Sequence, residues 1–177
     1  LKREPDKAQA SHLLAQLELR DGNIGAAKEL VLSALSLAPS APDFLVTLAE
    51  ITLAEGDANE AASILSDLES RATLSAPGYR LRAQLLFDGG HPGEAVGTLK
   101  RACEKFPKDS LMQRAIGIVL QAQGQLDEAL TALQTATELA PDDALCTIAL
   151  ASALDANGDF QGAHDILGHV LTADADN

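Results

Sequence analysis

The sequence predicts an all-α fold, a solenoid of stacked antiparallel helix pairs, because three columns of small residues share one period. The period is 34 residues, and it recurs five times in the 177-residue chain. One column is glycine, another lies seven residues before each glycine, and a third, always alanine, lies five residues after it. In this order the columns are Gly22, Gly56, Gly90, Gly124 and Gly158; Ala15, Ala49, Ala83, Gly117 and Ala151; and Ala27, Ala61, Ala95, Ala129 and Ala163.

Each column has a structural role within a helical hairpin. The glycine lies where the first helix ends and a left-handed backbone conformation is needed. The small residues on either side of it allow the two antiparallel helices to approach closely. Apolar residues at helical spacing from these columns are expected to fill the seam between the helices. On first helices they are Leu14, Leu48, Ile116 and Leu150, and on second helices Val31, Leu65, Leu99, Leu133 and Leu167.

Prolines and polar turns are expected to separate one hairpin from the next. Pro39, Pro107 and Pro141 each follow their glycine by 17 residues, and proline has no N–H with which to continue a helix. Segments 106–110 and 140–144 then supply turn and N-cap residues for the next hairpin.

This pattern resembles the tetratricopeptide repeat (TPR) family, whose repeat has the same period. The most similar stretch is AIGIVLQAQGQLDEALTALQTATELAP, residues 115–141. The resemblance implies a right-handed α-α superhelix that forms a single domain over residues 8–177. Arg82 stands where the family prefers a large apolar residue, so we expect a looser seam in the third repeat. The five repeats are residues 8–41, 42–75, 76–109, 110–143 and 144–177.

The register also predicts that the chain belongs to a longer array. Counting one period back from Pro39 leads to Pro5, so residues 1–7 are interpreted as the tail of a preceding repeat. An open terminal repeat exposes the face that its neighbour would cover. We therefore expect apolar residues of the last helix, including Leu167, Val170 and Leu171, to favour a homo-oligomer formed through repeat ends.

The net charge of −13 argues against two classes of partner. Nucleic acids and anionic membrane surfaces both attract clustered positive charge, whereas this chain has an excess of carboxylates. No apolar stretch approaches the roughly 18 residues of a membrane span, so direct membrane insertion is not expected. High alanine and leucine content with few lysines is typical of bacterial proteins, and we expect a cytoplasmic or periplasmic location.

No pattern in the sequence indicates catalysis, a cofactor or a metal. The glycine-rich segment 88–97 lacks the Lys-Ser/Thr pair of a phosphate loop. His164 and His169 would lie about 140° apart around a helix, so they cannot hold one ion from one face. Cys103 and Cys146 are 43 residues apart, match no metal or redox spacing, and are expected in the core. We therefore predict a protein that is not an enzyme.

The TPR resemblance implies a concave groove lined by the first helices. The second, fifth, ninth and twelfth residues of each repeat are expected to face it, including His12 and Val46 in the first two repeats. Repeats three to five combine two arginines with an apolar strip, a mixture typical of peptide-binding hot spots. Alternatively, each arginine simply pairs with a nearby acid such as Glu50 or Glu104. The candidate partner-binding residues are Arg80, Gln84, Phe87, Leu111, Arg114, Ile118, Gln121, Leu145 and Ile148.

Three functions of different classes fit these observations. The favoured one is a protein–protein interaction scaffold that binds a protein or peptide, including acidic groups held by the arginines, during assembly of a bacterial multiprotein or envelope complex. A second is the regulatory or substrate-presenting arm of a multidomain enzyme whose catalytic domain lies in another part of the chain. A third is a self-assembling structural array.

Overall fold

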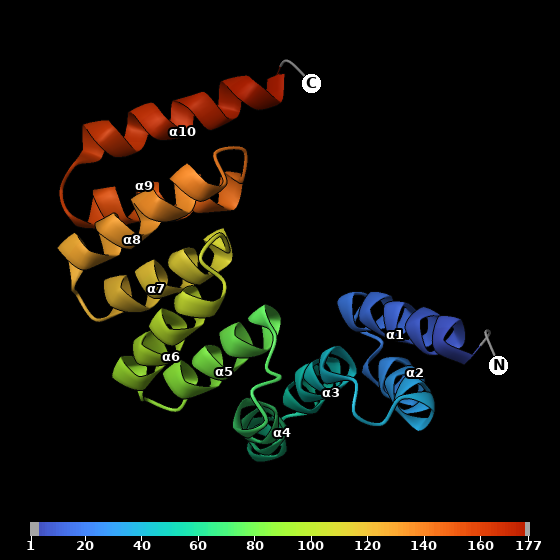
Figure 1. Ribbon diagram of the computed structural model, residues 1–177. Helices are drawn as coiled ribbons and strands as arrows, with labels where there is room; N and C mark the ends of the chain where they lie inside the picture. Colours follow the sequence, from blue (N-terminus) through green and yellow to red (C-terminus); the bar gives the residue numbers. More distant parts are fainter. Residues whose placement is uncertain (1–3, 176–177) are drawn as a thin grey trace. The chain divides into compact units, whose positions relative to one another are not determined.

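A computed structural model describes residues 4–175, and within this range the chain forms ten α-helices and no β-strand (Figure 1). The predicted all-α helical solenoid is thereby confirmed. The helices are α1 (Glu4–Arg20), α2 (Ile24–Leu37), α3 (Pro42–Ala54), α4 (Ala58–Ser70), α5 (Ala76–Asp88), α6 (Pro92–Lys105), α7 (Ser110–Ala122), α8 (Leu126–Leu139), α9 (Ala144–Ala156) and α10 (Phe160–Ala175).

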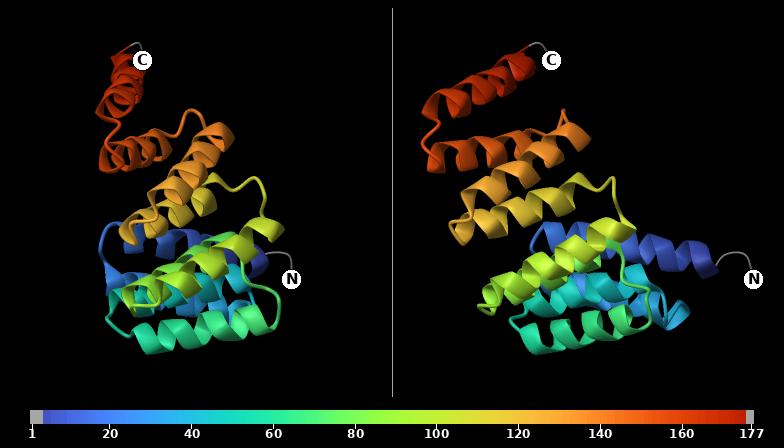
Figure 2. Two further views of the ribbon diagram at one scale, coloured as in Figure 1. Left: turned by 90° about the vertical axis from the view of Figure 1, so that its left-hand side faces the viewer. Right: turned by 60° about the vertical axis from the view of Figure 1, so that its left-hand side comes forward.

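The helices belong to two compact units that divide between Leu85 and Leu86. Unit 1 contains α1 to α4 and most of α5, and unit 2 contains the end of α5 and α6 to α10. Within each unit, helices joined by short turns run in opposite directions and pack side by side (Figure 2). A single continuous domain over residues 8–177 stays a prediction.

Four first helices begin at the first residues of their predicted repeats. These helices are α3, α5, α7 and α9, which start at residues 42, 76, 110 and 144. The first repeat differs, because α1 begins at Glu4 and not at residue 8. Residues 4–7, interpreted from the sequence as the tail of a preceding repeat, therefore form the first turn of α1. Pro5 is tolerated there because first-turn N–H groups have no partner within the helix.

The repeated glycines end the first helices as predicted. All five have positive φ angles, between 74° and 93°. At the first of them, the N–H of Gly22 donates to the carbonyl of Leu19 at 3.1 Å, and the N–H of Asn23 donates to that of Glu18 at 2.8 Å. This pair of bonds is a Schellman motif, which satisfies carbonyl groups at the end of the helix. The same pair recurs at each of the other four glycines.

The ends of the second helices follow the prolines where prolines are present. The helices α2, α6 and α8 each end two residues before Pro39, Pro107 and Pro141. The fourth helix has no such proline, and it ends in another Schellman motif with Ala72 at a φ of 57°. Ala72 is the one residue other than glycine with positive φ among the described residues.

The seam between paired helices is close and largely apolar. Ala15, Ala49 and Ala151 are buried, and a Cβ on Gly117 would overlap the Leu133 side chain. Most of the predicted seam residues are buried or half-buried. The prediction was wrong for Leu14 and Leu167, which are 49% and 37% exposed, because no described helix covers their faces.

Arg82 lies half-buried, where the family pattern has an apolar residue. Its Nε is 3.0 Å from Oε2 of Glu69, so an ion pair links α4 and α5 at this position. Both side chains retain about a quarter of their exposure, which allows solvent to screen the pair. The looser seam expected here stays a prediction.

Candidate protein-binding surface

Three large aliphatic side chains are exposed on the first helices of unit 2. Ile118 on α7 is 48% exposed, and Leu145 and Ile148 on α9 are 60% and 47% exposed. Leu145 and Ile148 are three residues apart, so they lie on one face of α9. The helices α7 and α9 contact each other directly. We call Ile118, Leu145 and Ile148 the α7/α9 surface.

A polar link between the two helices borders this surface. Nε2 of Gln121 donates to the hydroxyl of Ser152 at 3.1 Å and to its backbone carbonyl at 3.2 Å. Gln121 is one turn beyond Ile118 on α7, and Ser152 is one turn beyond Ile148 on α9. These hydrogen bonds therefore fix the α7 face that carries Ile118 relative to the α9 face that carries Ile148.

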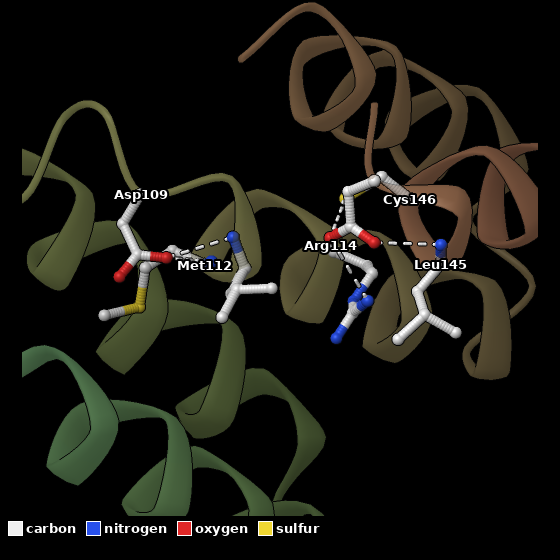
Figure 3. Close-up of polar contacts among 7 residues, drawn as sticks. Asp109, Met112, Arg114, Leu145 and Cys146 are labelled. Atoms are coloured by element: carbon white, nitrogen blue, oxygen red, sulfur yellow. Dashed lines mark hydrogen bonds and ion pairs between the residues drawn. The ribbon is translucent and has the colours of Figure 1, made fainter. Parts of the chain in front are cut away.

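A charged cluster lies on the other side of the surface, at the beginning of α9. The carboxylate of Asp143 accepts hydrogen bonds from the Leu145 N–H at 2.9 Å and the Cys146 thiol at 3.3 Å (Figure 3). Nη1 of Arg114 lies 3.7 Å from the same carboxylate. Burial would raise the pKa of Asp143, but these bonds and the guanidinium outweigh it and lower that pKa. Asp143 is thus an ionised N-cap that also orients Arg114.

The equivalent cap lies at the beginning of α7. Asp109 accepts hydrogen bonds from the N–H groups of Leu111 at 3.0 Å and Met112 at 3.3 Å (Figure 3). The two caps are 34 residues apart, so the repeat places Leu111 and Leu145 at equivalent positions. Their environments differ, since Leu111 is half-buried and Leu145 is exposed.

The remaining candidate residues lie on α5. Gln84 is exposed, whereas Arg80 and Phe87 are half-buried. Arg80 is close enough to Glu50 to affect its titration. Burial raises the pKa of Glu50, and the positive charge of Arg80 opposes this rise. Arg80 thus interacts with the acid that the sequence suggested for it, while Arg114 pairs with Asp143 and not with Glu104. A shared binding role for α5, α7 and α9 stays a prediction.

Two groove positions expected in the first repeats are buried instead. His12 and Val46 are only 4% and 3% exposed. Nε2 of His12 lies 2.8 Å from the Thr47 hydroxyl in a hydrogen bond, and its ring centroid is 4.5 Å from that of Phe44. The expectation that these residues face a groove was wrong, because His12 packs against α3 and Val46 lies next to Gly78 at the start of α5. A fixed repeat register does not reveal this polar pairing between neighbouring first helices.

A cavity lies between α6, α7 and α8, and no pattern in the sequence indicates it. It has a volume of about 390 Å³. Lys100 and Glu128 form an ion pair of 3.8 Å between its lining helices. Burial raises the pKa of the Cys103 thiol, so this lining residue is a poor nucleophile at neutral pH. The lining residues are Lys100, Cys103, Gln113, Ile116, Leu120, Glu128, Thr131, Ala132 and Thr135.

Neither metal clusters nor membrane spans are found in the part of the chain that the structure describes. No three His, Cys, Asp or Glu side chains there come together as metal ligands. None of the described helices is both long and apolar enough to cross a bilayer.

Family models and solved structures both match the chain. One tetratricopeptide repeat model matches residues 18–85 and 120–177, and a second matches residues 80–144. A thermophilic TPR protein of Thermus thermophilus is similar, with a TM-score of 0.80, 24% identity, and coverage of 93% of this chain and 90% of that chain. No curated protein matches the chain in sequence.

Two further structures share the fold. PilF of Pseudomonas aeruginosa has a TM-score of 0.81 at 18% identity, over 96% of this chain and 77% of that chain. YrrB, described as a TPR protein with an unusual peptide-binding site, has a TM-score of 0.62 at 20% identity, over 92% of this chain and 84% of that chain.

Proposed function

The chain belongs to the tetratricopeptide repeat family, and on this premise we propose that it is a protein-binding scaffold that uses the α7/α9 surface. The exposed Ile118, Leu145 and Ile148 carry this proposal. Clustered aliphatic side chains lose unfavourable contact with water when a partner covers them.

The polar groups beside the surface support a peptide-like partner. The Gln121–Ser152 bonds hold the two helices in one arrangement before any partner arrives, which lowers the entropic cost of binding. The partner would place aliphatic side chains against Ile118 and Ile148. An acidic group of the partner would be attracted to Arg114, although Asp143 already neutralises part of that charge.

Assembly of a bacterial multiprotein or envelope complex is the process we propose for this binding. The fold neighbours from Thermus and Pseudomonas support a bacterial setting, and YrrB is a protein of this fold with a peptide-binding site. In this proposal the chain acts by binding alone and requires no cofactor.

A random peptide library displayed on phage tests the proposal. We expect the selected peptides to contain aliphatic residues and to shift the amide NMR signals of α7 and α9. The double substitution Ile118→Asp and Ile148→Asp should weaken binding at least tenfold, about 1.4 kcal/mol or more. Leu32→Asp with Leu37→Asp is the matched control, because these leucines are 48% and 44% exposed on α2.

The same experiment has outcomes that would contradict the proposal. Equal loss of binding in the control pair, or NMR shifts confined to other helices, would place recognition elsewhere. The acidic preference is tested separately by Arg114→Gln. This substitution should weaken peptides that carry Asp or Glu, and it should leave purely aliphatic peptides unaffected.

A further inference from the structure

The cavity between α6, α7 and α8 lies within unit 2 and has an apolar wall. Its volume of about 390 Å³ falls in the range of small-molecule pockets, roughly 300–1,000 Å³. Ile116 and Leu120 on α7 and Ala132 on α8 form the apolar part of the lining, and they are 4%, 3% and 7% exposed. Ile116 and Leu120 are four residues apart, so they lie on one face of α7. The cavity therefore offers an apolar contact surface that is large enough for a small molecule.

Two residues that line the cavity are small for their positions in the repeat. Cys103 is equivalent to Leu35, which packs on the core of unit 1. Ala132 is the smallest residue of its column, whose other members are Leu30, Ile64, Thr98 and Ile166. Because Cys103 and Ala132 both line the cavity, leucine or isoleucine at these positions would occupy part of it. The repeat pattern by itself therefore does not require the cavity.

The polar groups of the lining carry no net charge. Lys100 and Glu128, whose side chains are 60% and 62% exposed, neutralise each other in their ion pair. Burial, reinforced by the negative charge of Asp109, raises the pKa of the Cys103 thiol, so this thiol stays protonated at neutral pH. A charged ligand would lose its hydration in the cavity without meeting an unpaired charge of the opposite sign. The remaining polar lining residues do not ionise, and they are Gln113, Thr131 and Thr135.

The two threonines of the lining can accept hydrogen bonds from a ligand, but their own protons are already used. The Thr131 hydroxyl donates to the Asp127 carbonyl at 3.0 Å, and the Thr135 hydroxyl donates to the Thr131 carbonyl at 2.9 Å. The half-buried side chain of Gln113 has an amide that can both donate and accept. A ligand hydroxyl complements this set, because it donates one hydrogen bond and accepts others.

From these features we propose that the cavity binds a small neutral molecule with an apolar body and a hydroxyl group. The apolar body would lie against Ile116, Leu120 and Ala132. The hydroxyl would accept a hydrogen bond from the Gln113 amide and donate one to a threonine oxygen. This site goes beyond the proposed protein-binding function and does not depend on it, because the α7/α9 surface contributes no residue to the lining.

Three compounds that share one aromatic ring test the proposal. At neutral pH benzyl alcohol is uncharged, benzoate is negative and benzylammonium is positive. We expect benzyl alcohol to shift the amide NMR signals of α6, α7 and α8 of the full chain until the shifts saturate. The two charged compounds should bind about tenfold more weakly, or less, because they would be buried without a free counter-charge.

A substitution that fills the cavity tests where benzyl alcohol binds. Ala132→Ile introduces the side chain that Ile64 and Ile166 have at the equivalent positions, and it should abolish the saturable shifts. Gln134→Ile is the matched control, because Gln134 is an exposed residue of the same helix outside the lining, and it should bind like the wild type. If Ale132→Ile loses helix content by circular dichroism, Cys103→Leu fills the same cavity and replaces it.

The thiol of Cys103 provides an independent measurement. A saturating concentration of benzyl alcohol should slow the alkylation of Cys103 by N-ethylmaleimide, because the ligand would cover this lining residue. Peptide mass spectrometry separates this reaction from that of Cys146, which is 0% exposed and should show no faster alkylation while the chain stays folded.

Several outcomes would overturn the inference. Benzyl alcohol would have no site in the cavity if it caused no saturable shift, left the rate at Cys103 unchanged, or bound Ala132→Ile as well as the wild type. Equal or tighter binding of benzoate or benzylammonium would refute the neutral ligand class. The double variant of Ile118 and Ile148 should bind benzyl alcohol normally, which separates this test from that of the α7/α9 surface.

Discussion

The buried histidine of α1 shows how one residue links two repeats. His12 is hydrogen-bonded to Thr47 and lies against the Phe44 ring, so it connects α1 to α3. Burial lowers the pKa of His12, and the nearby negative charge of Asp43 only partly opposes this. The neutral imidazole is therefore the form that the folded protein favours.

This lowered pKa predicts a loss of stability in mild acid. Above the unfolded-state pKa of about 6.5, His12 is neutral in both states and its protonation contributes nothing to the pH dependence. As the pH falls below that value, the unfolded chain takes up the proton first, so the free energy of unfolding decreases until the folded-state pKa is passed. Urea denaturation at a series of pH values should show this decrease in the wild type and a smaller one in His12→Gln.

Two comparisons isolate the contribution of His12. His91→Gln, at an exposed position, is the matched control for the replacement of a histidine side chain. Glu50, whose pKa is raised by burial, acts in the opposite direction as the pH falls, but it is present in every variant and cancels in the difference. Equal pH dependence in the wild type and His12→Gln would refute the assignment.

Among the elements, the α7–α8 hairpin shows the close approach between paired helices that the sequence predicted. Gly117 occupies a column that is alanine in the other repeats, and a Cβ there would overlap Leu133. Gly117→Ala should therefore destabilise the protein. Overpacking of this kind costs about 1–3 kcal/mol, and the better helix propensity of alanine recovers up to about 1 kcal/mol.

A second helical glycine provides the matched comparison. Gly97 lies within α6, and nothing is within 4 Å of the position that its Cβ would occupy. Gly97→Ala should therefore raise the free energy of unfolding by up to about 1 kcal/mol through propensity alone. Chemical denaturation measures both values. If both substitutions change the free energy of unfolding in the same direction, the close approach of Leu133 to Gly117 does not determine the effect of Gly117→Ala.

For the whole molecule, the positions of the helix ends were more predictable from the sequence than the exposure of individual side chains. The glycine and proline columns predicted the ends of most helices because local conformational limits act alike in every repeat. Exposure depends instead on which side chains meet between repeats. The pairing of His12 with Thr47 depends on residues that do not recur with the period. Repeat register alone therefore assigned His12 incorrectly to the groove.

The repeat arrangement also predicts which helices lose stability when a substitution destabilises one repeat. In repeat proteins each repeat contacts only its neighbours, so stability is close to a sum of local and nearest-neighbour contributions. The division between Leu85 and Leu86 suggests that unit 1 and unit 2 open as separate cooperative units. Gly117→Ala should therefore accelerate hydrogen exchange in the amides of α7 and α8 and, to a smaller degree, in those of α6 and α9.

Exchange in α1 to α3 should stay within error of the wild type, since these helices belong to the other unit. Hydrogen-exchange mass spectrometry with peptides assigned to each helix makes the measurement. His12→Gln supplies the reciprocal case, because it should accelerate exchange in α1 and α3 and leave α7 to α9 unchanged. A uniform acceleration of exchange across all helices in both variants would instead mean that the chain opens as one cooperative unit. In that case the contacts between repeats would be strong enough for a substitution in one repeat to destabilise all of them.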